Sequence, residues 1–252
     1  MTDPKGPVVS LTSYGARVKT VHIAIESIAR GKKKPSRIIL WLDNLSAEAI
    51  PRRLRNQEQR GLEIRTCSDL GPHKKYYPYL QSCISITDPL VTADDDLIYP
   101  RWWLARLADE WERHPDVLNC YRARRIHFDG QKLAGYMEWE LTNSSEPSYR
   151  HFAGSGAGAI LPISLQRSIK NAGKKFLDCC PRADDIWLHV QALRSGYKVR
   201  QIRQSEFRLI EICGSQQEAL WFENLDGGGN DQQIAATYSA RDLEILRTCE
   251  SR

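Results

Sequence analysis

The chain has 252 residues, 41% of them hydrophobic and 27% charged, which is enough for one large α/β domain or two small ones. The net charge of +5 favours anionic ligands or an anionic membrane surface, but it is too small to indicate nucleic-acid binding. No apolar run approaches the roughly 20 residues of a membrane helix, and the N-terminus lacks the apolar core of a signal peptide.

The first part of the chain alternates between strands and helices. Apolar runs predict buried strands over Val8–Thr12, Arg37–Leu42 and Leu62–Arg65. Helices are predicted between them, over Val18–Arg30 and from a cap at Ser46 to Gly61. This order implies a parallel, doubly wound sheet, and such sheets bind ligands at the carboxyl ends of their strands.

The next predicted strand ends in three carboxylates. The β-prone lead-in Leu90–Ala93 is followed by Asp94, Asp95 and Asp96. Adjacent negative charges repel one another, and Mg²⁺ or Mn²⁺, which prefer carboxylate oxygens, would remove the conflict. Strand alternation would direct Asp94 and Asp96 to the same side as ligands, and Asp95 toward the protein scaffold. The alternative interpretation is a solvated acidic turn.

The remainder of the chain predicts further alternating elements without a repeat or a linker, so we expect one domain. The predicted elements are a turn over Asp69–Tyr76, a partly helical Tyr77–Ile86, a helix from Pro100 to His114, a strand over Val117–Tyr121, hairpins and a loop over Arg122–Arg150, a glycine-rich segment over Phe152–Pro162, helices over Ser164–Gly173 and Asp184–Ser195, a strand over Val199–Ile202, a loop over Leu225–Asp231 and a terminal helix over Gln232–Cys249.

Two charged pairs could carry chemistry. Asp184 and Asp185 open a predicted helix, where carboxylates can act as a capping pair or where one can serve as a general base. Lys74 and Lys75 lie on a predicted turn, either as surface charges or facing the sheet edge to neutralise a diphosphate leaving group.

Glycines and aromatic residues give weaker signals. Gly154, Gly156 and Gly158 alternate with the period of a strand, which permits close approach of a substrate or of a neighbouring strand. Trp139 and Trp221 lie in polar, loop-like sequence and are candidates to stack on a sugar.

Other metal and nucleophile signals are weak or absent. Seven scattered cysteines without a Cys-x-x-Cys pair indicate reduced thiols in a cytoplasmic protein, rather than disulfides or a zinc site. His127, His151 and His189 could each complete a metal site, but a lone histidine is a weak signal. No Ser/His/Asp nucleophile motif is present.

Together these features resemble a GT-A-fold glycosyltransferase with an Asp-x-Asp motif, and more narrowly the bacterial glycosyltransferases that build surface polysaccharides. The resemblance rests on four blocks in order, namely Val-Ser-Leu-Thr-Ser-Tyr (Val9–Tyr14), Leu-Gly-Pro-His-Lys-Lys (Leu70–Lys75), Ala-Asp-Asp-Asp-Leu-Ile-Tyr-Pro (Ala93–Pro100) and Ala-Asp-Asp-Ile-Trp (Ala183–Trp187). It implies a single α/β domain over residues 1–252, with a doubly wound, mostly parallel sheet flanked by helices. Residues 1–100 would bind the nucleotide-sugar and residues 101–252 the acceptor.

The resemblance also implies an activity. The enzyme would use Mn²⁺ or Mg²⁺ to move a sugar from a nucleotide-diphosphate sugar, with UDP as the nucleotide, to a saccharide or lipid-linked acceptor. It would invert the anomeric centre with a carboxylate base, although inversion and retention both stay open on the residues alone. It would work in the cytoplasm, at the inner face of the membrane if peripherally associated, and without nucleic acid.

Roles for individual residues follow from the same resemblance. Asp185 would be the base with Asp184 as second candidate, and Asp94 and Asp96 would hold the metal. The residues expected around the nucleotide-sugar are Thr12, Tyr14, Arg17, Asp43, Lys74, Lys75, Asp94 and Asp95. The residues expected in the acceptor and sugar pocket are Gly154, Ser155, Gly156, Trp139 and Trp187.

Two other functions stay open. A metal-dependent nucleotidyltransferase also uses paired aspartates, but it would need a glycine-rich phosphate loop near the first strand, where Gly15 stands alone. A non-enzymatic cation-binding or nucleic-acid-binding module would leave the order of the four blocks unexplained.

Overall fold

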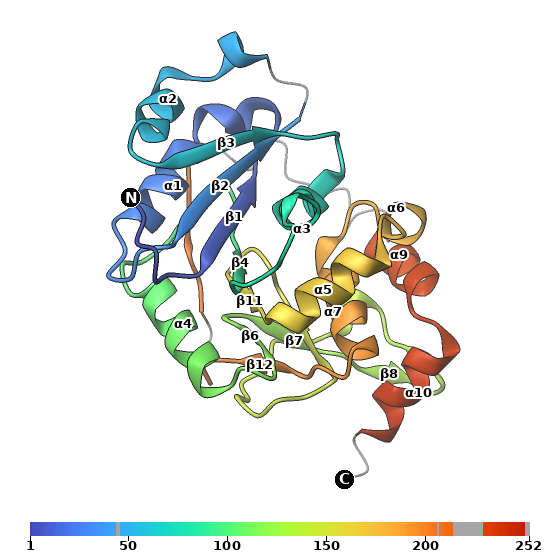
Figure 1. The fold of residues 1–252 in the computed structure, drawn as a ribbon. Coiled ribbons are helices and arrows are strands. Elements are labelled where there is room, and N and C mark those ends of the chain that lie inside the picture. Colours follow the sequence, from blue (N-terminus) through green and yellow to red (C-terminus); the bar gives the residue numbers. More distant parts are fainter. Residues whose placement is uncertain (44–45, 206, 214–228, 250–252) are drawn as a thin grey trace.

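The computed structural model describes residues 1–43, 46–205, 207–213 and 229–249. Its centre is a seven-stranded sheet in the order β12-β6-β11-β4-β1-β2-β3 (Figure 1). Neighbouring strands are parallel except at β11, which is antiparallel to both β4 and β6. The strands are β1 (Val8–Thr12), β2 (Arg37–Leu42), β3 (Leu62–Thr66), β4 (Leu90–Thr92), β6 (Leu118–Cys120), β11 (Ala159–Leu161) and β12 (Val199–Gln201).

The course of the chain creates a crevice beside β1. From β1 the chain adds β2 and β3 on one side, and then returns to place β4 on the other side of β1. Loops that leave β1 and β4 therefore diverge at the carboxyl edge of the sheet, which is where open α/β sheets bind ligands. Thr12 ends β1, and the three aspartates follow β4.

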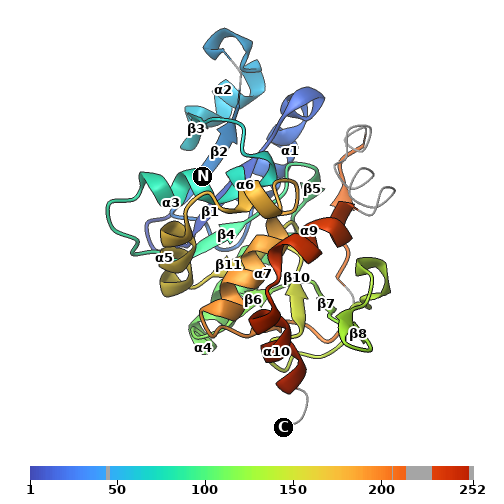
Figure 2. The ribbon, with the colours of Figure 1, turned by 90° about the vertical axis from the view of Figure 1, so that its right-hand side faces the viewer.

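Helices cover both faces of the sheet. Figure 1 shows α1 and α4 on one side and α3, α5 and α7 on the other, while Figure 2 shows α9 and α10 packed beside α7. The helices are α1 (Val21–Ala29), α2 (Arg52–Glu58), α3 (Tyr77–Ser82), α4 (Trp103–Arg113), α5 (Ile163–Ala172), α6 (Phe176–Cys179), α7 (Asp184–Arg194), α9 (Gly229–Thr237) and α10 (Ala240–Thr248). None in the described part of the chain is both long enough and apolar enough to cross a membrane.

The two faces of the sheet form separate hydrophobic cores. Val9 and Leu11 of β1 pack with the helices α1 and α4, whereas Val8 packs on the opposite face with α3 and α5. Burial of both faces explains why β2 is apolar from Ile38 to Leu42, and why even the polar Ser10 and Thr12 of β1 are buried. Both strands have the bounds predicted from the sequence.

Short strands and 3₁₀ turns complete the described fold. The paired strands are β7 (Ala123–Arg125) with β10 (His151–Ala153), β5 (Leu97–Ile98) with β13 (Ile210–Glu211), and β8 (Phe128–Asp129) with β9 (Lys132–Leu133). The 3₁₀ turns are η1 (Gly15–Lys19), η2 (Ala47–Ala49), η3 (Gly71–Lys75) and η4 (Tyr136–Glu138).

Three local predictions are wrong. The helix expected from Ser46 begins only at Arg52, after an extended Pro51, because a proline disfavours helical geometry in the residue before it. The expected terminal helix is two helices, since Ser239 is extended and caps α10 by accepting the backbone N–H of Asp242. Residues 229–231 of the expected loop form the start of α9, and residues 225–228 lie outside the described residues.

Candidate active site

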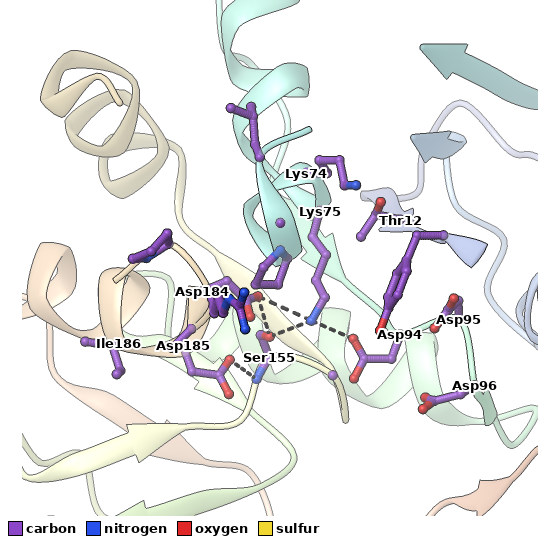
Figure 3. Close-up of a pocket in the computed structure, with 18 of the residues that line it drawn as sticks. Thr12, Lys74, Lys75, Asp94, Asp95, Asp96, Ser155, Asp184, Asp185 and Ile186 are labelled. Atoms are coloured by element: carbon purple, nitrogen blue, oxygen red, sulfur yellow. Dashed lines mark hydrogen bonds and ion pairs between the residues drawn. The ribbon is translucent and has the colours of Figure 1, made fainter. Parts of the chain in front are cut away.

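A cleft of about 1010 Å³ opens at the carboxyl edge of the sheet (Figure 3). Its walls combine residues from β1, η3, the turn after β4, the segment between β10 and β11, and the start of α7. The predicted site residues that line it are Thr12, Tyr14, Arg17, Asp43, Lys74, Lys75, Asp94, Asp95, Asp96, Ser155, Gly156, Asp184 and Asp185. The two acidic motifs, 90 positions apart in the sequence, therefore share one cleft.

Lys75 lies between these two motifs. Its buried Nζ is 2.6 Å from Oδ1 of Asp94 and 3.3 Å from Oδ2 of Asp184, and it donates to Oγ of Ser155 at 3.2 Å (Figure 3). Burial lowers the pKa of Lys75, but the surrounding carboxylates outweigh that effect and hold it well above its ordinary value. The ammonium group is therefore permanently charged at neutral pH.

The turn η3 that carries both lysines is anchored by His73. Its Nε2–H donates to the carbonyl of Cys180 at 2.7 Å, so Nδ1 accepts from the Tyr76 hydroxyl at 2.5 Å. Burial lowers the pKa of His73 to about 4, and the imidazole is neutral. Lys74, also buried, pairs with Asp43 at 2.8 Å. The bond to Cys180 fixes η3 against the segment before α7, and the pair with Asp43 joins it to the residue after β2.

The three aspartates after β4 have different surroundings. Asp95 is buried, accepting from Ser13 Oγ at 2.6 Å and from Arg17 Nη1 at 3.0 Å, while Asp96 pairs with Arg17 Nη2 at 3.1 Å. The exposed fractions of the side chains of Asp94, Asp95 and Asp96 are 31%, 6% and 13%. The prediction that Asp95 faces the scaffold is confirmed, but its cause is these partners, because β4 ends at Thr92 and strand alternation does not reach the triplet.

Burial, and after it repulsion within the triplet, raises the pKa values of two of its carboxyl groups. Burial and the nearby Asp94 raise the pKa of Asp96 to about 7, although Arg17 opposes this. Burial also raises the pKa of Asp95. Arg17 and Lys75 both oppose the increase at Asp96.

The turn after β1 lines the same end of the cleft. The Thr12 hydroxyl donates to the carbonyl of Trp41 at 2.9 Å, which fixes the side chain at the end of β1. The guanidinium of Arg17 lies 5.9 Å from the centre of the Tyr14 ring while it holds Asp95 and Asp96. The turn after β1 thus holds two aspartates of the triplet, through Ser13 and Arg17.

Ser155 links the opposite acidic pair to the sheet. Its backbone N–H donates to Oδ1 of Asp185 at 2.8 Å, and its hydroxyl donates to Oδ2 of Asp184 at 2.8 Å. Its carbonyl accepts from Oγ1 of Thr92 at 2.9 Å. Ser155 is itself buried, so its polar groups serve as links within the protein.

The two carboxylates of this pair differ in partners. Asp184 is paired with Lys75, whereas Asp185 forms no ion pair with any residue that the structure describes. Burial, followed by the charge of Asp184, raises the pKa of Asp185 to about 7. Asp185 is therefore the carboxylate suited to exchange a proton near neutral pH.

The glycines do not lie on a strand, so the predicted strand alternation is wrong. They form the turn between β10 and β11. A Cβ on Gly156 would lie 1.7 Å from Oδ2 of Asp94, whereas one on Gly158, with φ of 115°, would meet the Trp103 ring at 2.6 Å. The absence of a side chain at Gly156 thus leaves space for the Asp94 carboxylate, and its absence at Gly158 lets the Trp103 ring pack against the backbone. Gly154 does not line the cleft in the described part of the chain.

Two tryptophans were placed wrongly. The Trp139 ring is fully buried against Tyr136 and Phe152, with Nε1–H donating to the carbonyl of Ala134 at 3.0 Å, so it offers no face to a sugar. Trp187 is also buried in the core and not among the described residues of the cleft wall. Trp221 lies outside the described residues. Local polarity of the sequence does not reveal such burial.

Several lining residues were missed. They are Asp69, Arg122, Tyr136, Phe152, Leu177, Arg182 and Glu211, among others. Tyr136, which is partly exposed, provides aromatic surface where tryptophan was expected, whereas Phe152 is buried. Both lie in the region after residue 121, where the sequence has no clear periodicity, so only their proximity to the glycine-rich segment could have drawn attention to them.

The residues present fit a divalent cation shared with a ligand. No cluster of three or more His, Cys, Asp or Glu side chains suited to a metal occurs in the described residues. Asp94 and Asp96 do supply two hard carboxylates, and Mg²⁺ is commonly held by one or two carboxylates with phosphate oxygens and water. The wall of the cleft, as far as it is described, contains none of the three candidate histidines.

No protein-family model matches the sequence, and no relative is found among the curated proteins. Solved structures do match. A mannosyltransferase from Pyrobaculum calidifontis, in complex with GDP-mannose and Mn²⁺, aligns with a TM-score of 0.60 and 13% identity over 100% of this chain and 71% of its own. A 4-diphosphocytidyl-2C-methyl-D-erythritol synthase from Anaerococcus prevotii aligns with a TM-score of 0.55 and 16% identity, over 88% of this chain and 98% of its own.

TarS residues 1–349 from S. aureus align with a TM-score of 0.52 and 12% identity over 95% of this chain and 68% of that one. At these identities the likeness concerns the fold. The chain has a GT-A-like fold in a single domain, with a mostly parallel sheet flanked by helices, and the predicted fold class is confirmed.

Proposed function

We propose that this chain is a metal-dependent glycosyltransferase that moves a sugar from a nucleoside-diphosphate sugar to a hydroxyl of a saccharide or lipid-linked acceptor. The supporting observation is the cleft in which Lys75 joins an acidic triplet at the sheet edge to an acidic pair at a helix start. The mannosyltransferase with the same fold binds GDP-mannose and Mn²⁺. UDP as the nucleotide and surface polysaccharide as the product rest on the four sequence blocks.

The donor would occupy the side formed by residues 1–100. Asp94 and Asp96 would hold Mn²⁺ or Mg²⁺, which when bound neutralises charge on the diphosphate of the leaving nucleotide. Arg17 forms an ion pair with Asp96, and Lys75 forms one with Asp94. Both proposed metal ligands are therefore held in place before the donor binds. Thr12, Tyr14 and Asp43, further along the same wall, would contact the nucleoside.

The acceptor would bind on the side formed by residues 101–252. Its hydroxyl oxygen attacks the anomeric carbon while the bond to the diphosphate breaks, and its proton passes to Asp185. Asp184 is held by Ser155 and Lys75, which leaves Asp185 as the base and makes Asp184 a positioning residue. Attack from the face opposite the leaving group inverts the anomeric centre.

A nucleotidyltransferase is the second candidate, because the erythritol synthase shares the fold over 98% of its length. The turn after β1 contains only Gly15, and the glycine-rich phosphate loop expected of that class is absent from the described residues there. The two activities differ in product. With a sugar donor and acceptor, a glycosyltransferase releases a nucleoside diphosphate, whereas a nucleotidyltransferase consumes a triphosphate and releases pyrophosphate.

We expect UDP together with Mn²⁺ to raise the melting temperature of the protein, and Asp96→Asn to abolish the increase. A ligand that binds only the folded state stabilises it, by about 2.7 kcal/mol at 100 times its Kd. The measurement is a thermal melt with UDP, GDP, CDP and ADP, each with and without Mn²⁺. A panel that produces no shift with any diphosphate would contradict the proposed function.

We expect Gly156→Ala to weaken Mn²⁺-dependent nucleotide binding, by about 10-fold, because the new methyl group must displace the Asp94 carboxylate. Gly154→Ala is the matched control, since its Cβ would meet only the carbonyl of Arg122 at 3.6 Å. Binding is measured by calorimetry with UDP and Mn²⁺. Equal affinities of the two variants would show that Asp94 does not depend on the space at Gly156.

A further inference from the structure

Three cations of the cleft are each paired with two carboxylates. Lys74 pairs with Asp43 and Asp69, and Lys75 with Asp94 and Asp184. Arg17 pairs in the same way with Asp95 and Asp96. Each of these three cations is thus committed to two carboxylates of the protein.

Arg122 is different. Its side chain is exposed and lines the cleft, and it forms no ion pair or side-chain hydrogen bond with any residue that the structure describes. Its backbone is nevertheless fixed, because its carbonyl accepts the N–H of Gly154 at 2.8 Å. A guanidinium on a fixed backbone, open to the cleft, is suited to bind a carboxylate or phosphate through two parallel hydrogen bonds.

The position of Arg122 relative to the reacting groups follows from the next three residues. Gly154 contacts Arg122, Ser155 binds Asp185, and Gly156 abuts Asp94, in that order along the chain. The backbone of Arg122 is thus joined to the residue before Ser155, which binds Asp185, and Arg122 and Asp185 line the same cleft. The Tyr136 hydroxyl is close enough to both Asp185 and Arg122 to feel their charges. Burial is the main cause that raises its pKa, Asp185 raises it further, and Arg124 and Arg122 lower it.

We propose that the acceptor carries an anionic group, a carboxylate or a phosphate ester, which Arg122 binds while Asp185 faces the reacting hydroxyl. This inference rests on the proposed glycosyltransferase function and narrows its acceptor class. Arg122 brings a positive charge into the cleft, and a neutral saccharide has no group that would form an ion pair with it. The mildly basic chain agrees with a negatively charged substrate.

The test compares acceptors that differ only in charge. Transfer from a UDP-sugar with Mn²⁺ is measured to methyl hexosides, to the matching methyl hexuronides, and to the matching hexoside 6-phosphates. We expect kcat/KM to be about 10-fold or more higher for one anionic series than for the neutral one, as one charged hydrogen-bonding partner provides. The preferred series identifies carboxylate or phosphate as the recognised group.

Variants assign the preference to Arg122. Arg122→Gln should raise the KM for the anionic acceptor by about 10-fold or more, leaving neutral acceptors, the donor KM and donor hydrolysis unchanged. Arg122→Lys should keep part of the preference, and Arg52→Gln, at an exposed arginine outside the described cleft wall, should keep all of it.

Three results would overturn the inference. The first is a wild-type kcat/KM that is the same for neutral and anionic acceptors. The second is an equal fall in kcat/KM with neutral and anionic acceptors in Arg122→Gln. The third is a rise in the donor KM, instead of the acceptor KM, in Arg122→Gln. A failure of the proposed function is distinct, because the wild-type protein would then neither bind nucleotide with Mn²⁺ nor hydrolyse a nucleotide-sugar, and the inference would fall with it.

Discussion

Asp185→Asn is expected to lower the rate of sugar transfer by about 10²–10⁴-fold, the usual contribution of a positioned general base. The amide oxygen of asparagine can still accept the N–H of Ser155, which now donates to Asp185 at 2.8 Å, so the geometry of the cleft should persist. What is lost is the ability to take a proton from the acceptor. Nucleotide binding with Mn²⁺ should remain as in the wild type.

The pH profile separates this role from a structural one. Burial and Asp184 raise the pKa of Asp185 to about 7, and only the ionised form can accept a proton. In the wild type, kcat/KM should therefore rise as the pH increases toward 7 and level off above it. Asp96, a proposed metal ligand, has a similar pKa, so the profile is measured at saturating Mn²⁺, which would keep Asp96 ionised. Under that condition the limb should disappear in Asp185→Asn.

The control is Asp178→Asn, which changes an exposed aspartate on α6 outside the described wall of the cleft. Its transfer rate should match that of the wild type. Transfer at the wild-type rate in Asp185→Asn would remove Asp185 from the role of base, and Asp184→Asn would then be the next variant to assay.

Lys75→Met is expected to destabilise the protein by about 3–5 kcal/mol, the usual effect of removing one partner from a buried ion pair. Methionine has a similar volume, but it leaves the carboxylates of Asp94 and Asp184 without the ammonium that both contact. For a chain of this size, that loss corresponds to a fall in melting temperature of roughly 10 °C. Urea or thermal unfolding measures it directly.

Two comparisons make the Lys75 result specific. Lys32→Met removes a charge from an exposed lysine and should leave stability nearly unchanged. The destabilisation by Lys75→Met should also shrink in acid, because protonated carboxyl groups no longer require the ammonium. A variant that melts at the wild-type temperature would show that solvent or a rearranged neighbour replaces Lys75 without cost.

Local sequence signals predicted the elements whose surroundings are simple. Val8–Thr12 and Arg37–Leu42 are mostly apolar and buried because both faces of the sheet are covered, so their bounds could be predicted. The placement of Asp94–Asp96 and Asp184 at the ligand edge followed from strand and helix ends. These rules depend only on neighbours in the sequence.

Features that depend on distant contacts could not be predicted. The Trp139 ring is buried because Phe152 and Tyr136 cover it, and the sequence around it is polar. Lys75 meets Asp184 across 109 positions of sequence, so its role as a bridge is invisible before folding. The exposure of the Arg122 side chain to the cleft likewise depends on residues that are distant in the sequence.

The bridge at Lys75 also determines how substitutions in the cleft should be interpreted. Asp94, Lys75, Ser155 and Asp184 form one connected set of polar contacts, in which each member supports the next. Free-energy changes at contacting residues are not additive, since removal of one member alters the surroundings of the others. The effects of single substitutions cannot be summed to give the energy of this group, which belongs to the set and is accessible only through double-mutant cycles between its members.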